Sequence, residues 1–491
     1  MDGLAAGVFE RGELIVFTNC RNYLRWMAFG LVLCAPLART AGAQSTGAAS
    51  KVLTLEEAVD FALKNYPAVR ASLERVNAAQ AGIGLARTNY LPRADMVWQT
   101  NRATDNNITG LVLPQSIIAP ISGPVPAATS NQSAWGSAAG LLFSWEPVDF
   151  GYRGAKVDAA RAGRDRATAE ASLTRLDVAV ATVNAYLTVL AAQRTLHAAE
   201  ADVQRRETFD KAVRVLVDNQ LRAGADASRA DAELARARVN LARAQQQEKI
   251  SKAALADILG LPDTSVEVQE SFLLGPPPNG STQATPLINN PIAEVQHARV
   301  EEAQAQVHIL ERSYYPKFYL QSSVYGRGSG WDPAGNFEGG SAGLGPDRSN
   351  WAVGLTVTFP VFDIFGIRSR KAIESANERA EVARYDQALQ DLTGQLRKAQ
   401  ASLEGARNVA ENTPVELQAA RATEDQERSR YQAGLATLVD VADAQSLLVQ
   451  AETDDALARL AVWQNLASVA ASQGDLQPFL QFLHDKTQGG P

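Results

Sequence analysis

Cysteine is almost absent from this chain. Of 491 residues, only Cys20 and Cys34 are cysteines. Both lie in an N-terminal segment that resembles an export signal, because two arginines precede the short apolar run 26–38 and small residues follow, with cleavage favoured after Ala43. We expect a signal peptide over residues 1–43 and a mature chain without disulfides. Lipid attachment at Cys34 is the alternative, although the bulky preceding leucine suits it poorly.

Long apolar runs and excess positive charge are also missing. Beyond the signal, no uninterrupted apolar stretch is as long as the roughly 18 residues of a membrane-spanning helix. The nearest, 178–192, is bounded by Asp177 and Arg194. An exported chain of this kind is either soluble outside the cytoplasm or enters a membrane through strands. The formal net charge of −7 argues against nucleic acid as a partner.

Motifs of catalysis are missing too. The sequence has no G-x-S-x-G, no C-x-x-C, no phosphate-binding P-loop and no dinucleotide fingerprint. The four histidines lack the spacing of metal ligands. We therefore expect a protein that is not an enzyme, with no cofactor and no metal site.

What the sequence does contain is a tandem repeat. Three pairs of segments show it: 89–99 with 313–323, 140–153 with 354–368, and 226–234 with 440–448. Gly140 and Gly354, for example, lie 214 positions apart, and Pro92 corresponds to Pro316. Repeats of a fixed plan indicate a modular architecture rather than one compact core.

Each copy reads as helix, strand, loop, strand and long helical hairpin. The period-two alternation predicts strands near 93–102, 134–146, 316–327 and 350–360. The helical hairpins are expected at 153–260 and 367–473. The domain boundaries that follow are a first repeat 52–262, an equatorial linker 263–286, a second repeat 287–475 and a C-terminal tail 476–491.

The strands fit a membrane as well as they fit a soluble sheet. In 351–359 the odd positions are all large and apolar, from Trp351 to Phe359, and the even positions are Ala, Gly and Thr. Nine to eleven tilted residues are enough to cross a bilayer, and aromatics near strand ends fit interfacial girdles. A half-buried soluble sheet would alternate in the same way, so the pattern alone leaves both interpretations open.

The long helices carry heptads. Apolar residues recur at steps of three and four at Leu173, Leu176, Val180, Val183, Leu187 and Leu190. A helix from Arg153 to about Gln220 would be about 100 Å long. We expect its partners to be the antiparallel helices 226–259 and 437–473 and other copies of the chain.

The number of strands predicts an assembly. Four strands cannot close a membrane barrel, since the smallest barrels have about eight. An open sheet edge in lipid leaves backbone groups without hydrogen-bond partners. If these strands cross a membrane, several chains must therefore contribute to one barrel.

The plan as a whole resembles the TolC-type outer-membrane efflux proteins, over about 52–475. The residues that carry the resemblance are RYQAGLATLVDVADAQ (430–445), the strand-to-helix corners VDFG (148–151) and FDIFG (362–366), and ILGLP (258–262). The order of these segments and their duplication make the resemblance specific.

The resemblance implies an α+β membrane protein: a long antiparallel coiled-coil α-barrel plus four strands from each chain in a shared trimeric β-barrel. It implies a homotrimer in the cell outer membrane, with a periplasmic extension, outer-membrane lipid around it and no nucleic acid. The implied function is a passive exit duct of a tripartite efflux pump or type I secretion system. Its partners would be a periplasmic adaptor (membrane fusion) protein and an inner-membrane pump. A structural coiled-coil protein of the periplasm or cell surface is the alternative.

The resemblance also assigns a site at the hairpin tips. A pore constriction and gate would be formed by Asp440, Asp443 and Tyr431, and the tips and adaptor contact by Arg222, Gly224, Gly434, Leu435 and Leu438. The two acids share a helix face, and rings of acids select cations. The family's tip arginine falls at Ala436, so Arg222 or Arg430 would have to replace it. As alternatives, Asp440 caps a helix and the leucines pack inside the tip.

Overall fold

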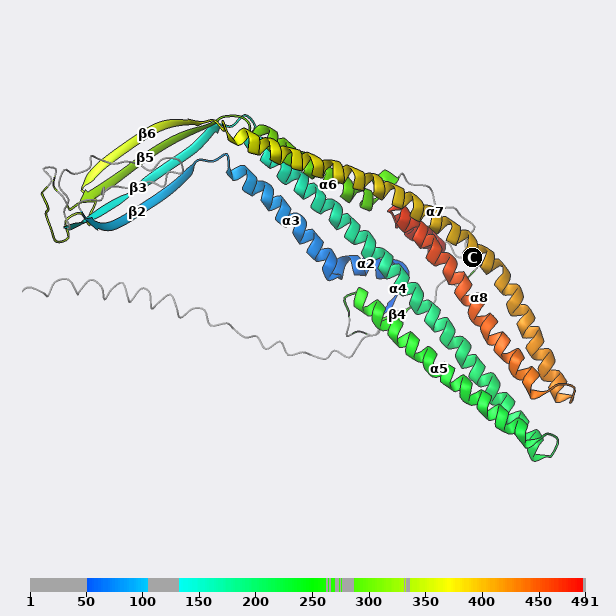
Figure 1. Cartoon of the computed structure of the whole chain (residues 1–491). Helices are drawn as coiled ribbons and strands as arrows, with labels where there is room; N and C mark the ends of the chain where they lie inside the picture. Colours follow the sequence, from blue (N-terminus) through cyan, green and yellow to red (C-terminus); the bar gives the residue numbers. More distant parts are fainter. Residues whose placement is uncertain are drawn as a thin grey trace, which may run out of the picture. The chain divides into compact units, whose positions relative to one another are not determined.

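The computed structural model describes residues 51–104, 132–261, 287–330 and 336–488, together with residues 264, 266–269, 273, 275 and 332. The predicted signal peptide and most of the predicted linker, 263–286, lie outside the described residues. Within the described part, two long helical hairpins and a four-stranded sheet account for most of the chain (Figure 1).

The described elements repeat the order helix, strand, strand, helix, helix twice, with one further helix before the first copy and one after the second. They are α2 (Leu55–Asn65), α3 (Pro67–Thr88), β2 (Arg93–Thr104), β3 (Ser133–Val148), α4 (Tyr152–Asp218), α5 (Gly224–Ile258), α6 (Pro291–Arg312), β5 (Lys317–Ser329), β6 (Arg348–Thr358), α7 (Asp363–Gln432), α8 (Leu438–Gln473) and α9 (Gln477–Gln488). Two short strands, β1 (Lys51–Leu53) and β4 (Val266–Val268), pair in parallel. A single 3-10 turn, η2 (Leu287–Asn289), precedes α6.

Local sequence signals explain where the helices begin. Thr54 and Glu57 form a capping box at the start of α2, as the sequence predicts. Pro67 occupies the first turn of α3, where a missing backbone N–H has no cost. At the corresponding position, Pro291 begins α6, and the Asn290 side chain accepts a hydrogen bond from the amide of Ile292 at 2.9 Å.

The core lies along the middle of α4. Of the predicted heptad, Val183, Leu187 and Leu190 are fully buried, whereas its N-terminal members are only partly buried. Tyr186 is also fully buried, and its hydroxyl donates to the backbone oxygens of Leu53 at 3.1 Å and of Gln269 at 3.2 Å. This side chain therefore ties α4 to the small β1–β4 sheet. The helices α3, α5, α6 and α8 also pack against α4.

One helix of the described part, α4, is apolar enough by length and composition to cross a membrane, with a mean hydropathy of 1.3 over an 18-residue window. Half of that window is buried inside the chain. The helices of a protein core have the same apolar composition. The buried contacts of Tyr186 show that α4 is a core helix of this chain.

The sheet has the strand order β2–β3–β5–β6, with every neighbouring pair antiparallel. The outer edges of β2 and β6 pair with no other described strand. The β3 strand is longer than the sequence predicts, and β6 is displaced by two residues from its predicted bounds. Trp145 donates from its indole nitrogen to the backbone oxygen of Tyr90 at 3.1 Å, which fixes the sheet to the end of α3.

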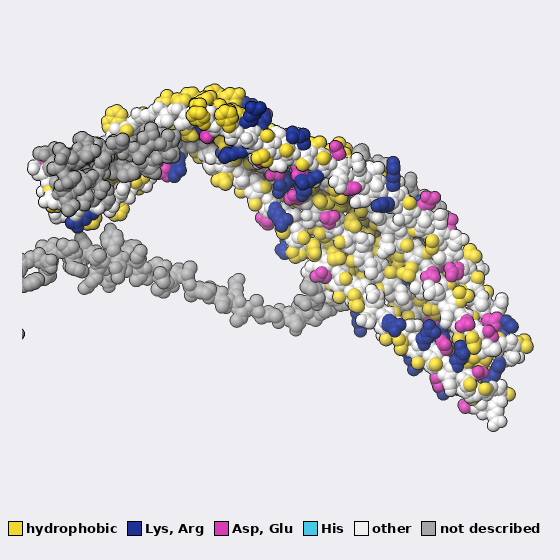
Figure 2. Space-filling view, viewed as in Figure 1, with side chains coloured by type: hydrophobic (Ala, Val, Ile, Leu, Met, Phe, Trp, Pro, Cys, Tyr) yellow, Lys and Arg dark blue, Asp and Glu magenta, His cyan; other side chains and the backbone are white. Residues whose placement is uncertain are grey.

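One face of this sheet is apolar and exposed. Met96, Leu141, Val324 and Trp351 lie opposite one another across all four strands, and they are 83%, 44%, 62% and 77% exposed. Figure 2 shows hydrophobic side chains gathered over β6 and its junction with α7. A sheet folded against its own core would bury these side chains, so the exposed face favours the membrane interpretation of the alternation.

Candidate functional site at the hairpin tips

The tip of the second hairpin turns at Gly434. α7 ends at Gln432, and Gly434 has a φ of +78°, which favours glycine at this position. α8 then begins with a capping box: the amide and hydroxyl of Thr437 donate to the Asp440 carboxylate at 2.8 and 2.7 Å. These hydrogen bonds, and to a lesser extent the charge of Arg430, hold the pKa of Asp440 below its usual 3.8.

Both acids of the predicted constriction are at the surface of the tip. Asp440 is exposed despite its capping role, so the capping alternative is compatible with a role in a pore. Asp443 is exposed one turn further along α8 and has no hydrogen-bond or ion-pair partner in the described part of the chain. The two carboxylates therefore lie near one helix end and face solvent in a single copy.

The first hairpin turns differently from the prediction. Its left-handed residue is Gln220, with a φ of +62°. Gly224, which the sequence placed at the turn, is instead the first residue of α5. The amide of Leu221 donates to Leu216 at 2.8 Å and closes the end of α4. The turn therefore precedes the predicted glycine by four residues.

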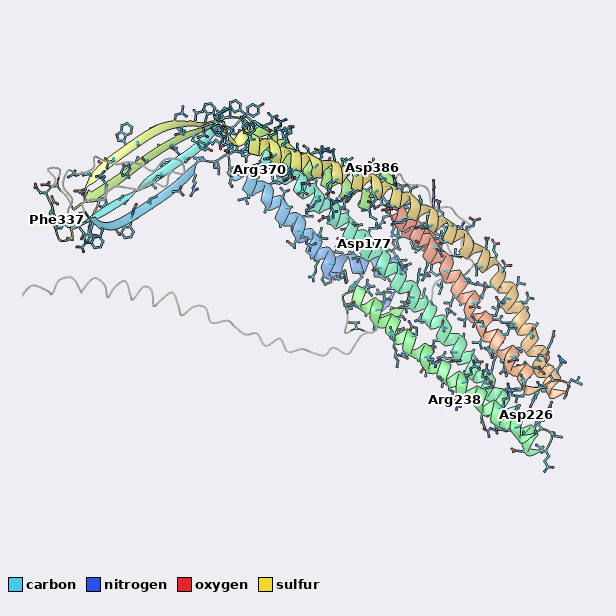
Figure 3. All side chains as sticks on the ribbon, viewed as in Figure 1. Asp177, Asp226, Arg238, Phe337, Arg370 and Asp386 are labelled. Carbon is cyan, nitrogen blue, oxygen red and sulfur yellow. The ribbon has the colours of Figure 1, made fainter. Side chains whose placement is uncertain are left out.

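Side chains from both hairpins meet at Tyr431. Arg222 donates to the backbone oxygen of Tyr431 at 2.8 Å, and its guanidinium carbon lies 4.4 Å from the centre of the tyrosine ring. The Tyr431 hydroxyl donates to Asp226 of the first hairpin at 3.4 Å. Figure 3 labels Asp226 at the start of α5. Of the two candidate arginines, Arg222 thus bridges the two hairpins, whereas Arg430 pairs with Glu427 on its own helix at 2.7 Å.

Tyr431 is held in a small apolar cluster between the hairpins. Its side chain is 1% exposed and its ring centre lies 5.2 Å from that of Phe209. Burial, and secondly the nearby charge of Asp226, raise the pKa of the Tyr431 hydroxyl, so it stays a neutral donor. Sequence reasoning did not select Asp226 or Phe209 for this site, although Asp226 begins the first-repeat segment that matches Asp440.

The two predicted tip leucines have different environments. Leu435 is 71% exposed, whereas Leu438 is 3% exposed and packs in the cluster around Tyr431. For Leu438 this geometry favours the alternative of packing inside the tip. A third leucine, Leu221, is 69% exposed in the turn of the first hairpin, and the sequence analysis did not single it out.

Further from the tips, a buried ion cluster joins the hairpins. Arg206 is 7% exposed. It donates to Asp202 at 2.9 Å, to Glu233 at 3.0 Å and to the Ser446 hydroxyl at 3.1 Å. These partners belong to α4, α5 and α8. Because a buried guanidinium without its carboxylates is strongly unfavourable, the cluster fixes the relative positions of the three helices.

The described residues contain no group of three or more His, Cys, Asp or Glu side chains placed to hold a metal ion. The tip side chains instead include two exposed acids, the buried Tyr431, which contacts both hairpins, and exposed leucines. Such an arrangement can select ions, hold two hairpins together and contact another protein.

Comparison with known proteins gives the family. The family model of outer membrane efflux proteins matches residues 58–261 and 285–475. The chain is 26% identical to Protein CyaE of Bordetella pertussis, over 86% of this chain and 84% of that protein. It is also 26% identical to the pyoverdine export outer membrane protein OpmQ of Pseudomonas aeruginosa, over 84% of this chain and 83% of that protein.

Solved structures agree with the fold. The CmeC outer membrane channel of Campylobacter jejuni matches with a TM-score of 0.68 at 17% identity, over 86% of this chain and 85% of that one. The matched segments contain both hairpins. The exposed apolar face of the sheet agrees with strands that contact membrane lipid. The chain therefore belongs to the outer membrane efflux protein family, and it is an exit duct of the outer membrane.

Proposed function

We propose that three copies of this chain form one duct, with twelve strands closed into a single barrel and the hairpins arranged as a periplasmic tunnel. The observation that carries this proposal is the sheet: it exposes an apolar face, and the outer edges of β2 and β6 pair with no other strand among the described residues. An open edge in lipid costs several kcal/mol for each unpaired backbone group. Sharing strands between copies removes every edge.

The two repeats have the same structural role in this proposal. Residues 52–262 and 287–475 each supply two strands to the barrel and one hairpin to the tunnel. The segment 263–286 and the tail 476–491 form an equatorial belt around the tunnel. The signal peptide over 1–43 directs export and is removed.

The gate of the duct is at the tips. In three copies, Asp440 and Asp443 place six carboxylates around one opening, where crowding of like charges attracts cations within roughly one 8 Å Debye length. The contacts of Tyr431 with Arg222 and Asp226 hold the second hairpin against the first in each copy. Releasing those contacts lets the second hairpin move outward and widens the opening.

Partners bind at the same end. A periplasmic adaptor contacts the exposed leucines of the tips, chiefly Leu435, and an inner-membrane pump delivers the cargo. Leu438 is covered in this conformation and becomes available only if the tip cluster opens. The names of relatives such as the pyoverdine exporter describe their own cargo, and the cargo of this chain depends on its pump.

The test is to express the whole chain and examine outer-membrane fractions. We expect a species of three copies by native mass spectrometry in detergent, and cation-selective conductance when it is added to a planar bilayer. A single copy in the aqueous periplasmic fraction, without conductance, would refute the shared barrel. Conductance by a species with another number of copies would refute the trimer alone.

A further inference from the structure

The two repeats can be compared residue by residue at the junction between the sheet and the helices. Helices α3 and α6 both have 22 residues and begin at Pro67 and Pro291, so an offset of 224 positions relates them and the strands that follow, β2 and β5. At the corners that lead into α4 and α7, Gly151 corresponds to Gly366, an offset of 215. These two offsets identify the counterpart of each charged side chain near the junction.

On the strands, a cation and its acid in the first repeat correspond to a lysine and a tyrosine in the second. Arg93, at the start of β2, pairs with Asp95 at 2.8 Å. The corresponding residues at the start of β5 are Lys317 and Tyr319. Lys317 therefore lacks the acid of its counterpart, and it forms no ion pair with any acid in the described part of the chain.

On the helices, the acid is missing from the first repeat instead. Lys371 of α7 pairs with Glu311 of α6 at 2.9 Å, whereas the corresponding residues are Lys156 of α4 and Arg87 of α3. An acid is thus replaced by a second cation. Lys156, like the lysine of β5, forms no ion pair with an acid among the described residues.

The two lysines that lack an acid meet at one aromatic ring. The Nζ atoms of Lys156 and Lys317 lie 4.5 Å and 4.9 Å from the centre of the Tyr152 ring. The two nitrogens are therefore no further apart than the sum of these distances. The ring attracts both cations and holds them near each other, at the end of the sheet where α4 begins (Figure 1). Two ammonium groups held in this way can both donate to one anion.

This lysine pair lies on the polar side of the sheet. Along β5 the exposed apolar side chains are at even positions such as Val324, which lies opposite Leu141 and Trp351. Lys317, at an odd position, therefore points to the other face. One acid, Glu146, is on that face at the end of β3. With it included, the two lysines still leave one positive charge in each copy.

We propose that Lys156 and Lys317 form an anion-binding site on the inner wall of the duct, where the barrel meets the tunnel, and that it binds carboxylate or phosphate groups of the cargo. This inference rests on the proposed trimer, because the polar face of the sheet becomes an inner wall only in a closed barrel. In three copies, six ammonium groups line the wall at this level, and rings of lysine favour anions. A lipid headgroup offers the same chemistry, but the lysines lie on the face turned away from lipid.

Block of the current by citrate tests the site. Citrate, which carries three carboxylates, is added to the parent chain in a planar bilayer of phosphatidylcholine, and we expect it to reduce the single-channel current. Lys156→Gln with Lys317→Gln should weaken this block about tenfold, because hydrogen bonds to charged groups are lost. Lys156→Arg with Lys317→Arg keeps both charges over the ring and should retain the block.

The matched control removes the two counterpart cations. Arg93→Gln with Lys371→Gln changes the net charge by the same amount, but each of these cations is already neutralised by an acid. We expect this control to weaken the block less than about twofold, since exposed ion pairs interact weakly. Equal weakening in the two double variants would show that the net charge of the wall causes the block, and it would overturn the site.

The outcomes separate the site from the duct. If the parent chain conducts but citrate does not block it, or if the lysine-to-glutamine variant is blocked as strongly as the parent, the site is wrong while the duct stands. A parent chain that gives no conductance would refute the duct itself. A block that disappears when phosphatidylglycerol is added to the bilayer would assign the lysines to a lipid headgroup, and it would overturn the assignment to cargo.

Discussion

Arg222 and Tyr431 are in contact across the two hairpin tips, with the guanidinium 2.8 Å from the tyrosine backbone oxygen and 4.4 Å above its ring. Tyr431 is the last residue but one of α7, and Arg222 lies in the turn between α4 and α5. Together with the hydrogen bond from the Tyr431 hydroxyl to Asp226, this pair links the two hairpins at the proposed gate.

Removing this link should open the duct. Arg222→Ala loses a hydrogen bond and a cation–π contact, together worth on the order of 1–3 kcal/mol. We expect a larger single-channel conductance in a planar bilayer. Arg428→Ala is the matched control, because Arg428 pairs with Glu424 and Asp425 on its own helix. Equal conductance for the two variants would exclude Arg222 from gating.

The acids of the tip should control cation block. Replacing Asp440 and Asp443 with Asn removes the charges of the proposed ring, so divalent cations should block the current several-fold less strongly. Asp443→Asn alone separates charge from capping, because only Asp440 bonds to Thr437. Asp454→Asn, which removes an acid bonded to Gln450 on α8, is the control. Unchanged block in the double variant would rule out the ring.

The capping box makes that block dependent on pH in a definite direction. Hydrogen bonds from Thr437 lower the pKa of Asp440 below 3.8. The ionised carboxylate therefore contributes its full stability above pH 3.8, and this contribution is lost as the pH falls through the lowered pKa of the folded protein. Thr437→Ala removes the hydroxyl bond but keeps the bond from the backbone amide, so it raises this pKa part of the way toward its usual value. We expect divalent block by the variant to fade at a higher pH than in the parent.

The control for this experiment is Thr423→Ala, because the Thr423 hydroxyl bonds only to the backbone of its own helix, at Ala419. Its pH profile should match that of the parent chain. If Thr437→Ala also leaves the profile unchanged, Asp440 is not the titrating group of the block.

The buried cluster around Arg206 should be important for stability. Arg206→Ala leaves Asp202 and Glu233 without their common partner, and removing one member of a buried pair costs about 3–5 kcal/mol. We expect a clear drop in the thermal unfolding midpoint measured by circular dichroism. Arg238→Ala should change it much less, since Arg238 and its partner Glu207 are 58% and 41% exposed and exposed pairs contribute about 0–1 kcal/mol. Equal drops would show that burial is not the cause.

A close approach between strands predicts a folding defect. Gly140→Ala places a methyl group against the β5 backbone at Tyr325, and overpacking of this kind costs typically about 1–3 kcal/mol or more. We expect less protein in the outer membrane and more in aggregates. Gly405→Ala, in α7 with nothing within 4 Å, should have no such effect, and normal insertion of Gly140→Ala would contradict the close approach.

Features set by neighbouring residues could be predicted from the sequence. The capping box of Thr54 and the turn at Gly434 follow from short patterns, and the structure has both. The alternation along β6 predicted which side chains share a face, and the structure shows that this face is exposed. The repeat offsets also came from the sequence, because Pro92 and Pro316 mark the same corner twice.

Features set by packing between distant segments could not be predicted. Arg206 bonds to Ser446, 240 positions away, and no local pattern marks that pair. Gly224 was assigned to the hairpin tip from the family resemblance, but the end of α4 closes earlier, at Gln220. Leu438 looked like a tip residue, yet the capping box of α8 turns it into the cluster with Tyr431.

The equal lengths of α3 and α6 have a consequence for assembly. In a ring of three copies, half of the junctions between repeats form inside a chain and half between chains. Because the two repeats belong to one chain, each sees the other at an effective concentration of about millimolar. The junctions within a chain therefore form however dilute the protein is. Only the junctions between chains, at the outer edges of β2 and β6, depend on protein abundance, and natural variation that weakens assembly should accumulate there without unfolding the chain.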